Sequence, residues 1–252
     1  MPTSYTYSTN GKFNVIKTSA AKLKPIIILK NVCATSEVGI NGCFFNYPNP
    51  AKNDGFGISW HVDLTSADTC TSNKQTATGA EMTKGTICGY NDSTGKLRVH
   101  IAPVKNFTEM KTKVSALSSA NTPRYMIGGG SLYLTSDTNW NSVVANEGWN
   151  DPYHQGQVDN IVKNGRSGIG YKDESDGYTY VYLAVSQYND STNGATSADL
   201  RKLFQDLKCN EAIFLDGGGS SQMQCGKPDN TIFTKNGDGR NVWNMVSLIP
   251  PL

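Results

Sequence analysis

The sequence has no hydrophobic segment long enough to cross a membrane, because its longest apolar run, Pro25 to Leu29, has the length of one strand and is flanked by lysines. A large excess of charge is also missing, since 23 basic and 21 acidic residues leave a net charge of +2. The chain therefore offers no charged surface typical of proteins that bind polymeric nucleic acid or anionic membranes. We expect a soluble protein without such partners.

Cysteines at metal-binding spacing are absent as well, because no C-x-x-C motif occurs and the three histidines are not grouped with the cysteines. We expect no zinc site and structural roles for His61, His100 and His154. The six cysteines are spread over the chain: Cys33, Cys43, Cys70, Cys88, Cys209 and Cys225. They suit either three disulfides of an extracellular protein or six thiols in a reducing compartment. The N-terminus lacks the basic and apolar regions of a signal peptide, so either the protein is not exported by this route or a signal has been removed.

What the sequence does contain indicates one loop-rich domain with β-structure, since its 252 residues include many Gly, Ser, Thr and Asn. Single strands are expected over residues 25–30, 38–46, 57–62, 97–102 and 243–249. Residues 124–134 are expected to form two strands with a tight turn at 128–130, and residues 166–171 and 178–185 are expected to form a hairpin. Helices are expected over residues 106–117 and 196–207, and loops over 47–89, which Cys70 and Cys88 could staple, and 140–163, a candidate lid.

This order of elements predicts an α+β fold, with a mixed β-sheet core and a few packing helices in a single domain. We interpret residues 1–37 as an N-terminal arm or edge strands packed on a domain formed by residues 38–252.

The segment from Glu211 to Met223 stands out, because a strand-length apolar run leads directly into Asp216, the glycines Gly217–Gly219, and the hydroxyls of Ser220 and Ser221. Three successive glycines allow positive φ angles and a close approach of the backbone to a ligand. The segment therefore predicts the floor of a binding site. The alternative is a tight β-turn of no functional importance.

Three known motifs do not fit this turn. A P-loop requires a lysine after its last glycine, where this chain has Ser220. A nucleophile elbow requires G-x-S-x-G, and an EF-hand requires alternating acids before its glycine; neither pattern is present. What remains is a carboxylate beside a glycine nest, which suits an anion or sugar hydroxyls.

Three further residues fit that chemistry. Arg166 and Arg240 lie beside glycines, and their fork-shaped guanidinium groups suit phosphate or carboxylate, although each singly could be a surface arginine paired with an acid. Asn41 precedes a glycine inside an expected strand, where a bulge or a close backbone approach is usual. It is a second candidate site residue or a simple bulge residue.

Five blocks, in order along residues 38–248, resemble the phosphodiester glycosidase family. They are Asn41-Gly42-Cys43-Phe44-Phe45, Gly128-Gly129-Gly130-Ser131-Leu132, Arg166-Ser167-Gly168-Ile169-Gly170, Asn210 to Met223, and Arg240-Asn241-Val242. The family usually has Gly at position 43 and Thr-Ala at positions 167 and 168, so the departures are to small residues. Residues 47–96 and 138–163 match nothing in the family, which leaves the aglycone side of the substrate undefined.

The resemblance implies a hydrolase that cleaves the glycosidic C–O bond of a sugar-1-phosphodiester, for which one family member uses N-acetylglucosamine. It implies a small-molecule or glycan sugar-phosphate substrate, and it demands no metal and no cofactor. The catalytic residues would be Asp216, as general base or stabiliser of the cationic transition state, and Arg166, on the phosphodiester. The implied substrate-binding residues are Asn41, Gly42, Gly217, Gly218, Gly219, Ser220, Ser221, Arg240 and Asn241.

Two other functions remain open from the residues. One is a carbohydrate-binding or surface module that keeps the fold without catalysis. The other is a phosphodiesterase or nucleotide-signal hydrolase that cuts the P–O bond.

Overall fold

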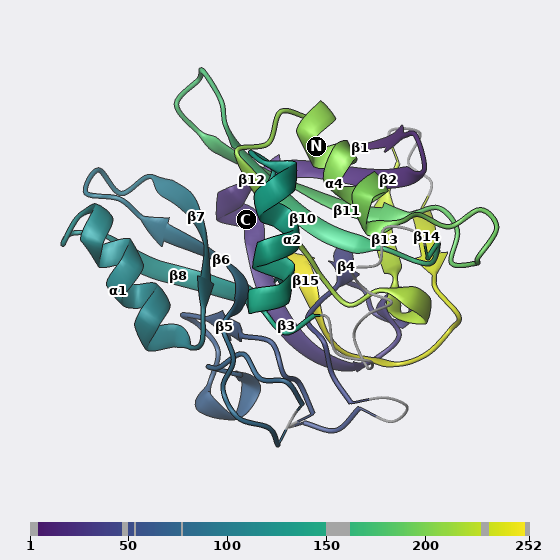
Figure 1. Ribbon diagram of the computed structural model, residues 1–252, viewed down its shortest axis with the longest axis horizontal. Helices are drawn as coiled ribbons and strands as arrows, with labels where there is room; N and C mark the ends of the chain where they lie inside the picture. Colours follow the sequence, from purple (N-terminus) through teal and green to yellow (C-terminus); the bar gives the residue numbers. More distant parts are fainter. Residues whose placement is uncertain are drawn as a thin grey trace.

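The computed structural model describes residues 5–46, 50–52, 54–76, 78–149, 162–227 and 232–249. These residues form three β-sheets (Figure 1), and every described strand pair is antiparallel. The expected mixed sheet was therefore wrong in strand direction. A fold built mostly of β-sheet with three helices among the described residues agrees with the expected mixture of strands and a few helices.

The first sheet has six strands in the order β1 (Tyr5–Asn10), β2 (Phe13–Ser19), β11 (Thr179–Ser186), β10 (Ser167–Asp173), β12 (Glu211–Phe214) and β9 (Gly130–Ser131). The second has the order β14 (Ile232–Asn236), β13 (Gln222–Gly226), β4 (Gly39–Asn41), β15 (Val242–Leu248) and β3 (Leu23–Lys30). The third has the order β5 (Ser59–His61), β8 (Thr122–Gly128), β6 (Lys84–Asn91) and β7 (Leu97–Val104).

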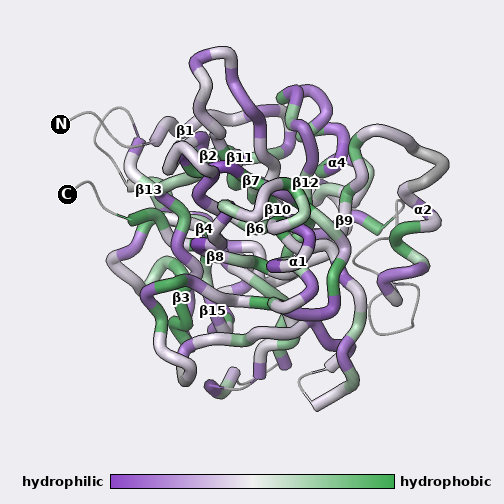
Figure 2. Tube along the Cα trace, turned by 90° about the vertical axis from the view of Figure 1, so that its left-hand side faces the viewer, coloured by the Kyte–Doolittle hydropathy of each residue, from purple (hydrophilic) through white to green (hydrophobic). Residues whose placement is uncertain are grey.

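One hydrophobic core joins the sheets. Ile16 and Ile213 of the first sheet, Ile40 and Val246 of the second, and Ile127 of the third are all buried in it. Figure 2 agrees, since hydrophobic stretches run through the strands while many peripheral loops are hydrophilic. Residues of all three sheets thus pack against one another, and a hydrogen bond between Ser167 and Asn41 joins the start of β10 to the end of β4.

The helices begin at side-chain caps that the sequence encodes. Helix α1 (Phe107–Leu117) starts after Asn106, whose side chain accepts a bond from the Glu109 N–H, and it packs on the third sheet through Met110 and Val114. Helix α4 (Ser197–Asp206) starts with a complete capping box between Thr196 and Asp199. Such caps satisfy N–H groups that a helix leaves unpaired, and both expected helices are confirmed.

Two segments expected to be loops contain regular structure. Strand β6 was missed because seven of its eight residues are buried, so it shows no polar alternation, and its glycines admit close neighbours. Helix α2 (Asp137–Asn146) was missed because its sequence is rich in Asn, and only Trp140 and Val144 mark its buried side. Of the candidate lid at residues 140–163, residues 150–161 lie outside the described residues, as does His154.

The segment 124–134 is two strands, but they do not pair with each other. Strand β8 belongs to the third sheet and β9 to the first, and the N–H of Gly129 donates to the carbonyl of Gly85 at 2.8 Å as the chain crosses. By contrast, the expected hairpin forms, with β10 paired to β11. The division at residue 37 stays a prediction; β2 lies inside the first sheet, between β1 and β11.

All six cysteines are free thiols, so the staple between Cys70 and Cys88 was wrong. Burial raises the pKa of the Cys43 thiol to about 12, which keeps it protonated and unreactive. His61 is 4% exposed, and its Nδ1 accepts a bond from the Asp63 N–H at 3.1 Å, which is a structural role.

Candidate functional site

Asp216 lies where the first two sheets meet. It follows β12 by two residues, and the chain there is fixed to both sheets: the Leu215 N–H donates to Ser167 of β10 at 2.8 Å, and the Asp216 N–H donates to Gly42, next to β4, at 3.3 Å. The side chain of Asp216 is half-buried. The expected strand thus delivers this carboxyl to the junction of two sheets.

The carboxamide of Asn41 holds this junction together. Its Nδ2 donates to the Asp216 carbonyl at 2.7 Å, and its Oδ1 accepts from Ser167 Oγ at 2.7 Å and from the Gln222 N–H at 3.1 Å. One side chain on β4 therefore ties together the start of β10, Asp216 and the start of β13. Asn41 is 1% exposed, so its described contacts position the site from behind.

The glycine turn, which we define as Gly217–Ser221, is a short 3₁₀ helix packed against a second glycine segment. Gly218 has a φ of 58° and its N–H donates to the Gly165 carbonyl at 2.8 Å. A Cβ on Gly219 would stand 2.1 Å from Asp238 Oδ2 and 2.5 Å from Arg240 Nη2. Glycine is required at both positions, for the backbone angle at one and for close approach of an ion pair at the other.

Burial dominates the electrostatics of Asp216. It raises the pKa of this carboxyl from 3.8 to about 7, while the Ser220 hydroxyl, the Arg240 guanidinium and the Gly217 N–H oppose the rise. At neutral pH the group therefore exists in comparable amounts as acid and as carboxylate. A carboxyl tuned in this way is suited to proton transfer.

The two arginines have different surroundings. Arg166 is 3% exposed, and its guanidinium donates to the carbonyls of Ala195 at 3.2 Å and Val162 at 2.9 Å. Arg240 is partly exposed and forms a two-pronged ion pair with Asp238, including an Nε contact of 2.9 Å. Arg240 thus carries its charge at the rim of the glycine turn, and Arg166 carries its charge beneath the surface.

The remaining expected site residues fall around this centre. Gly42 is buried, and its Cβ would stand 2.3 Å from Asn244 Oδ1, so glycine is needed for packing there. Asn241 is exposed. Ser220 and Ser221 are 1% and 0% exposed; the Ser220 hydroxyl lies against the Asp216 carboxyl, whereas the Ser221 hydroxyl makes no hydrogen bond with the described residues. An unpartnered buried hydroxyl beside a tuned carboxyl is unusual and points to a ligand or ordered water there.

Sequence reasoning missed two residues at the site. Asp238 holds Arg240 over the glycine turn. Its position in a Gly-Asp-Gly-Arg segment, next to an arginine already singled out, could have predicted this role. Asn189 places its amide beside Gly165 and Ser221, and only the fold brings this residue to the turn. Among the described residues no group of three or more His, Cys, Asp or Glu side chains could hold a metal ion.

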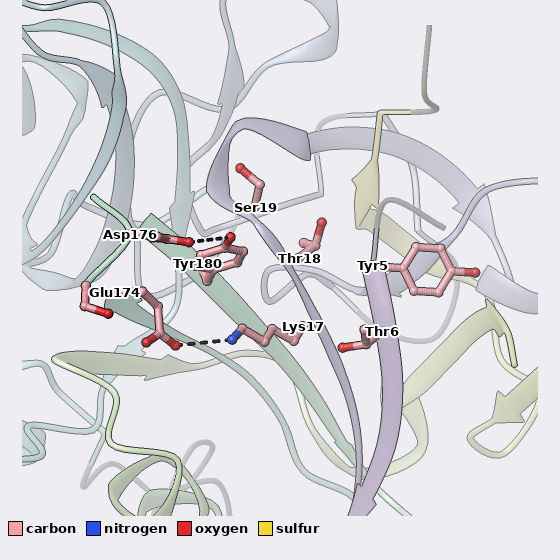
Figure 3. Close-up of a pocket in the computed structure, with 9 residues that line it drawn as sticks. Tyr5, Thr6, Lys17, Thr18, Ser19, Glu174, Asp176 and Tyr180 are labelled. Atoms are coloured by element: carbon pink, nitrogen blue, oxygen red, sulfur yellow. Dashed lines mark hydrogen bonds and ion pairs between the residues drawn. The ribbon is translucent and has the colours of Figure 1, made fainter. Parts of the chain in front are cut away.

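A separate cavity of about 550 Å³ lies beside the β10–β11 hairpin (Figure 3). It is lined by Tyr5, Thr6, Lys17, Thr18, Ser19, Glu174, Ser175, Asp176 and Tyr180 and is called the hairpin cavity below. Lys17 Nζ pairs with Glu174 at 3.2 Å, and the Tyr180 hydroxyl donates to Asp176 at 3.0 Å. It lies at the opposite end of β10 from Ser167, roughly 20 Å away along the strand, and contains none of the expected site residues.

Comparison with known proteins identifies relatives of the fold. The sequence model of the phosphodiester glycosidase family matches residues 34–249. The structure is similar to the catalytic domain of zebrafish N-acetylglucosamine-1-phosphodiester alpha-N-acetylglucosaminidase, which was solved in a form auto-inhibited by its pro-peptide. The TM-score is 0.61 at 14% sequence identity, and the match covers 98% of this chain and 82% of the zebrafish chain. A protein of Burkholderia pseudomallei described as exported is similar with a TM-score of 0.50, 12% identity, and coverage of 94% and 74%. No curated protein matches the sequence at a significant level.

Within the described residues, no helix is long and apolar enough to cross a membrane.

Proposed function

Because this chain belongs to the phosphodiester glycosidase family and is thus a hydrolase of that type, we propose that it cleaves the glycosidic C–O bond of a sugar-1-phosphodiester. The products are the free sugar and a phosphate monoester. One observation carries the proposal: Asp216, with a pKa raised to about 7, stands at a glycine turn that an arginine ion pair overlies. This combination provides proton transfer and anion recognition side by side.

The reaction needs little protonation of its leaving group. As the bond between the anomeric carbon and the phosphate oxygen breaks, its electron pair goes to the phosphate, and the sugar passes through an oxocarbenium-like state. A water molecule adds to the anomeric carbon, and Asp216, in its carboxylate form, takes the proton from that water. A base with a pKa near 7 is suited to this step at neutral pH.

The phosphate group is assigned to Arg240, which lies against the glycine turn. Arg240 offers a fork-shaped donor at the partly exposed rim, where Asp238 now occupies it, so a phosphodiester would compete with that carboxylate. Ser220 supplies a hydroxyl to phosphate or sugar oxygens. Asn41 and the buried Arg166 act mainly as positioning residues, since their described bonds hold the segments that carry the site.

The test is hydrolysis of sugar-1-phosphodiesters in water labelled with oxygen-18. Methyl phosphodiesters of N-acetylglucosamine 1-phosphate are the first choice, because the zebrafish protein is named for that sugar-phosphodiester linkage. Cleavage of the C–O bond leaves the released methyl phosphate unlabelled, whereas attack at phosphorus places the label in a phosphate. Labelled phosphate, or no product from any sugar tested, would contradict the proposal.

A further inference from the structure

The backbone of Arg240 is anchored from the interior by two buried amide side chains. Gln222 Nε2 donates to the Arg240 carbonyl at 2.9 Å, and Asn31 Nδ2 donates to the same carbonyl at 3.1 Å. Gln222 is fully buried, and Asn31 is buried as well. A carbonyl that accepts two such donors is fixed in position. The guanidinium of Arg240 thus extends to the partly exposed rim from a backbone that is held below it.

The side chain of Gln222 is itself fixed at its other end. Its Oε1 accepts from the Val32 N–H at 2.8 Å, while its Nε2 donates to Arg240. Only one orientation of the amide satisfies a donor on one side and an acceptor on the other. In addition, the backbone N–H of Gln222 donates to Asn41 Oδ1 at 3.1 Å. Gln222 therefore connects the segment of Arg240 to the carboxamide that holds the Asp216 carbonyl.

A continuous chain of hydrogen bonds thus joins the segments that carry the two charged groups of the site. Asn41 Nδ2 donates to the Asp216 carbonyl at 2.7 Å, Asn41 Oδ1 accepts from the Gln222 N–H, and Gln222 Nε2 donates to the Arg240 carbonyl. Asn41 and Gln222 are both buried, so water does not compete for these bonds. The chain fixes the backbone of Arg240 relative to the backbone of Asp216.

The separation of these two residues matters for the chemistry. The charge of Arg240 lowers the pKa of Asp216, and this effect weakens as the groups move apart. A phosphate bound to Arg240 must also lie where the water activated by Asp216 reaches the anomeric carbon. The ion pair between Asp238 and Arg240 joins two residues of one loop, so it does not fix that loop relative to Asp216. Bonds to other segments, such as those of Gln222, do.

We propose that Gln222 is a positioning residue that holds Arg240 at a set distance from Asp216 and thereby couples phosphate recognition to proton transfer. This inference rests on the proposed function, because it takes Arg240 as the phosphate ligand and Asp216 as the base. Gln222 has no exposed surface with which to contact a substrate. It acts through Arg240, and the resemblance to the family assigns it no role.

Strand β13, which begins at Gln222, also supplies the matched control. Gln224 has the same side chain two residues further along, and its Nε2 donates to the carbonyls of Thr35 and Glu37 at 2.8 and 3.2 Å. These bonds are of the same kind, but they lead to the segment before β4 and not to Arg240. Methionine keeps most of the volume of glutamine and removes its hydrogen bonds. Gln222→Met should therefore disturb the site, whereas Gln224→Met should affect stability alone.

The kinetic test is a double-mutant cycle with Arg240→Ala. Values of kcat and KM for the methyl phosphodiester of N-acetylglucosamine 1-phosphate are measured as a function of pH. Gln222→Met should raise KM by about threefold or more and move the acidic limb of the pH–rate profile to higher pH, and Gln224→Met should change neither. In the Arg240→Ala background, Gln222→Met should have no further effect, because the residue that it positions is gone. Equal losses in both backgrounds would overturn the inference.

A second measurement needs no turnover. The Asp216 carboxyl is titrated by NMR in protein labelled with carbon-13 at aspartate, and its signal is identified by its absence in Asp216→Asn. We expect a higher pKa of Asp216 in Gln222→Met than in the wild type and in Gln224→Met. If Gln222→Met does not fold, Gln222→Asn, whose amide is one methylene too short to reach the Arg240 carbonyl, replaces it in both measurements.

The outcomes separate this inference from the proposed function. An unchanged KM and an unchanged pKa of Asp216 in a folded Gln222 variant overturn the inference and leave the proposed function standing. If the wild type hydrolyses no sugar-1-phosphodiester, the proposed function fails, and the titration decides the rest. A raised pKa of Asp216 then still supports the positioning of Arg240 by Gln222, whereas an unchanged pKa removes that role as well.

Discussion

The glycine turn and the hairpin cavity differ in how completely their polar groups are satisfied. The hairpin cavity is roomy and lined by charged residues, but Lys17 pairs with Glu174 and Tyr180 with Asp176. Beside the glycine turn lies a carboxyl with a displaced pKa, and among the described residues three buried side-chain atoms there, Asn189 Nδ2 and Oδ1 and Ser221 Oγ, have no hydrogen-bond partner. Its groups are held ready for a ligand, whereas those of the cavity already bind one another. Buried polar groups without hydrogen-bond partners, more than the volume of a cavity, therefore identify the candidate site.

The strongest way to test this contrast is to neutralise one carboxyl in each region. Asp216→Asn should lower kcat by at least about 100-fold, because the amide cannot accept the proton from water. Asp176→Asn in the hairpin cavity should leave kcat unchanged. Steady-state hydrolysis of a sugar-1-phosphodiester measures both, and a fully active Asp216→Asn would remove the basis for placing the chemistry at the turn.

The second largest effect concerns stability. Asn41→Ala should lower the free energy of unfolding by roughly 3 kcal/mol, because it leaves Ser167 Oγ, the Gln222 N–H and the Asp216 carbonyl without their buried partner. Urea denaturation followed by tryptophan fluorescence provides the value. Thr6→Ala, in the wall of the hairpin cavity, is the control and should change it little. Equal stability losses in both variants would contradict the prediction that Asn41 stabilises the fold more than a residue in the wall of the hairpin cavity does.

Arg240→Ala should raise KM by about tenfold, because a rim guanidinium that contacts phosphate contributes a charge-assisted hydrogen bond. It should also move the acidic limb of the pH–rate profile to higher pH, since Arg240 lowers the pKa of Asp216. A KM change without a shift of that limb would mean that Arg240 contacts substrate but does not influence Asp216.

A smaller effect is the pH dependence of stability. The native state keeps the Asp216 proton up to a pH of about 7, whereas an unfolded chain releases it near 3.8. The contribution of this group to stability is therefore complete below that lower value and declines as the pH rises through 7. Thermal melts of the wild type minus those of Asp216→Asn should reveal the decline. A difference that stays constant between pH 4 and 8 would show that the pKa of Asp216 is not raised.

The smallest effect is expected for Lys17→Met in the hairpin cavity. Lys17 pairs with Glu174, but the two side chains are 37% and 24% exposed, and exposed ion pairs contribute about 0–1 kcal/mol. Neither turnover nor the melting temperature should change appreciably. A large loss of activity would show that the cavity takes part in the function.

The sequence predicted the parts of this molecule whose signals are local. The helices over residues 106–117 and 196–207 and the strand that delivers Asp216 each depend on a few neighbouring residues, and each formed as expected. Strand β6 was hidden because both of its faces are buried, and the alternation that marks a strand requires one face in water.

The site was predictable only where its residues lie in continuous motifs. Asp216 and the glycines belong to one segment, so their proximity follows from the chain itself. The three bonds of Asn41 join segments that are more than a hundred residues apart. The side-chain amide of Asn189 approaches the glycine turn from a separate loop. Such contacts arise from the way the sheets pack, and no local pattern encodes them. The buried position of Arg166, bonded to carbonyls, was likewise invisible in its motif.

The carboxamide of Asn41 has a consequence for how the protein gains and loses activity. It belongs to the second sheet, yet its bonds reach Ser167 of β10 in the first sheet and the carbonyl of Asp216, which follows β12 of that same sheet. A partly folded chain with only one sheet assembled would therefore lack an ordered glycine turn. Enzymatic activity should appear in refolding only after the sheets have docked, and proteolytic fragments that contain a single sheet should be inactive. Turnover is thus a direct reporter of complete assembly.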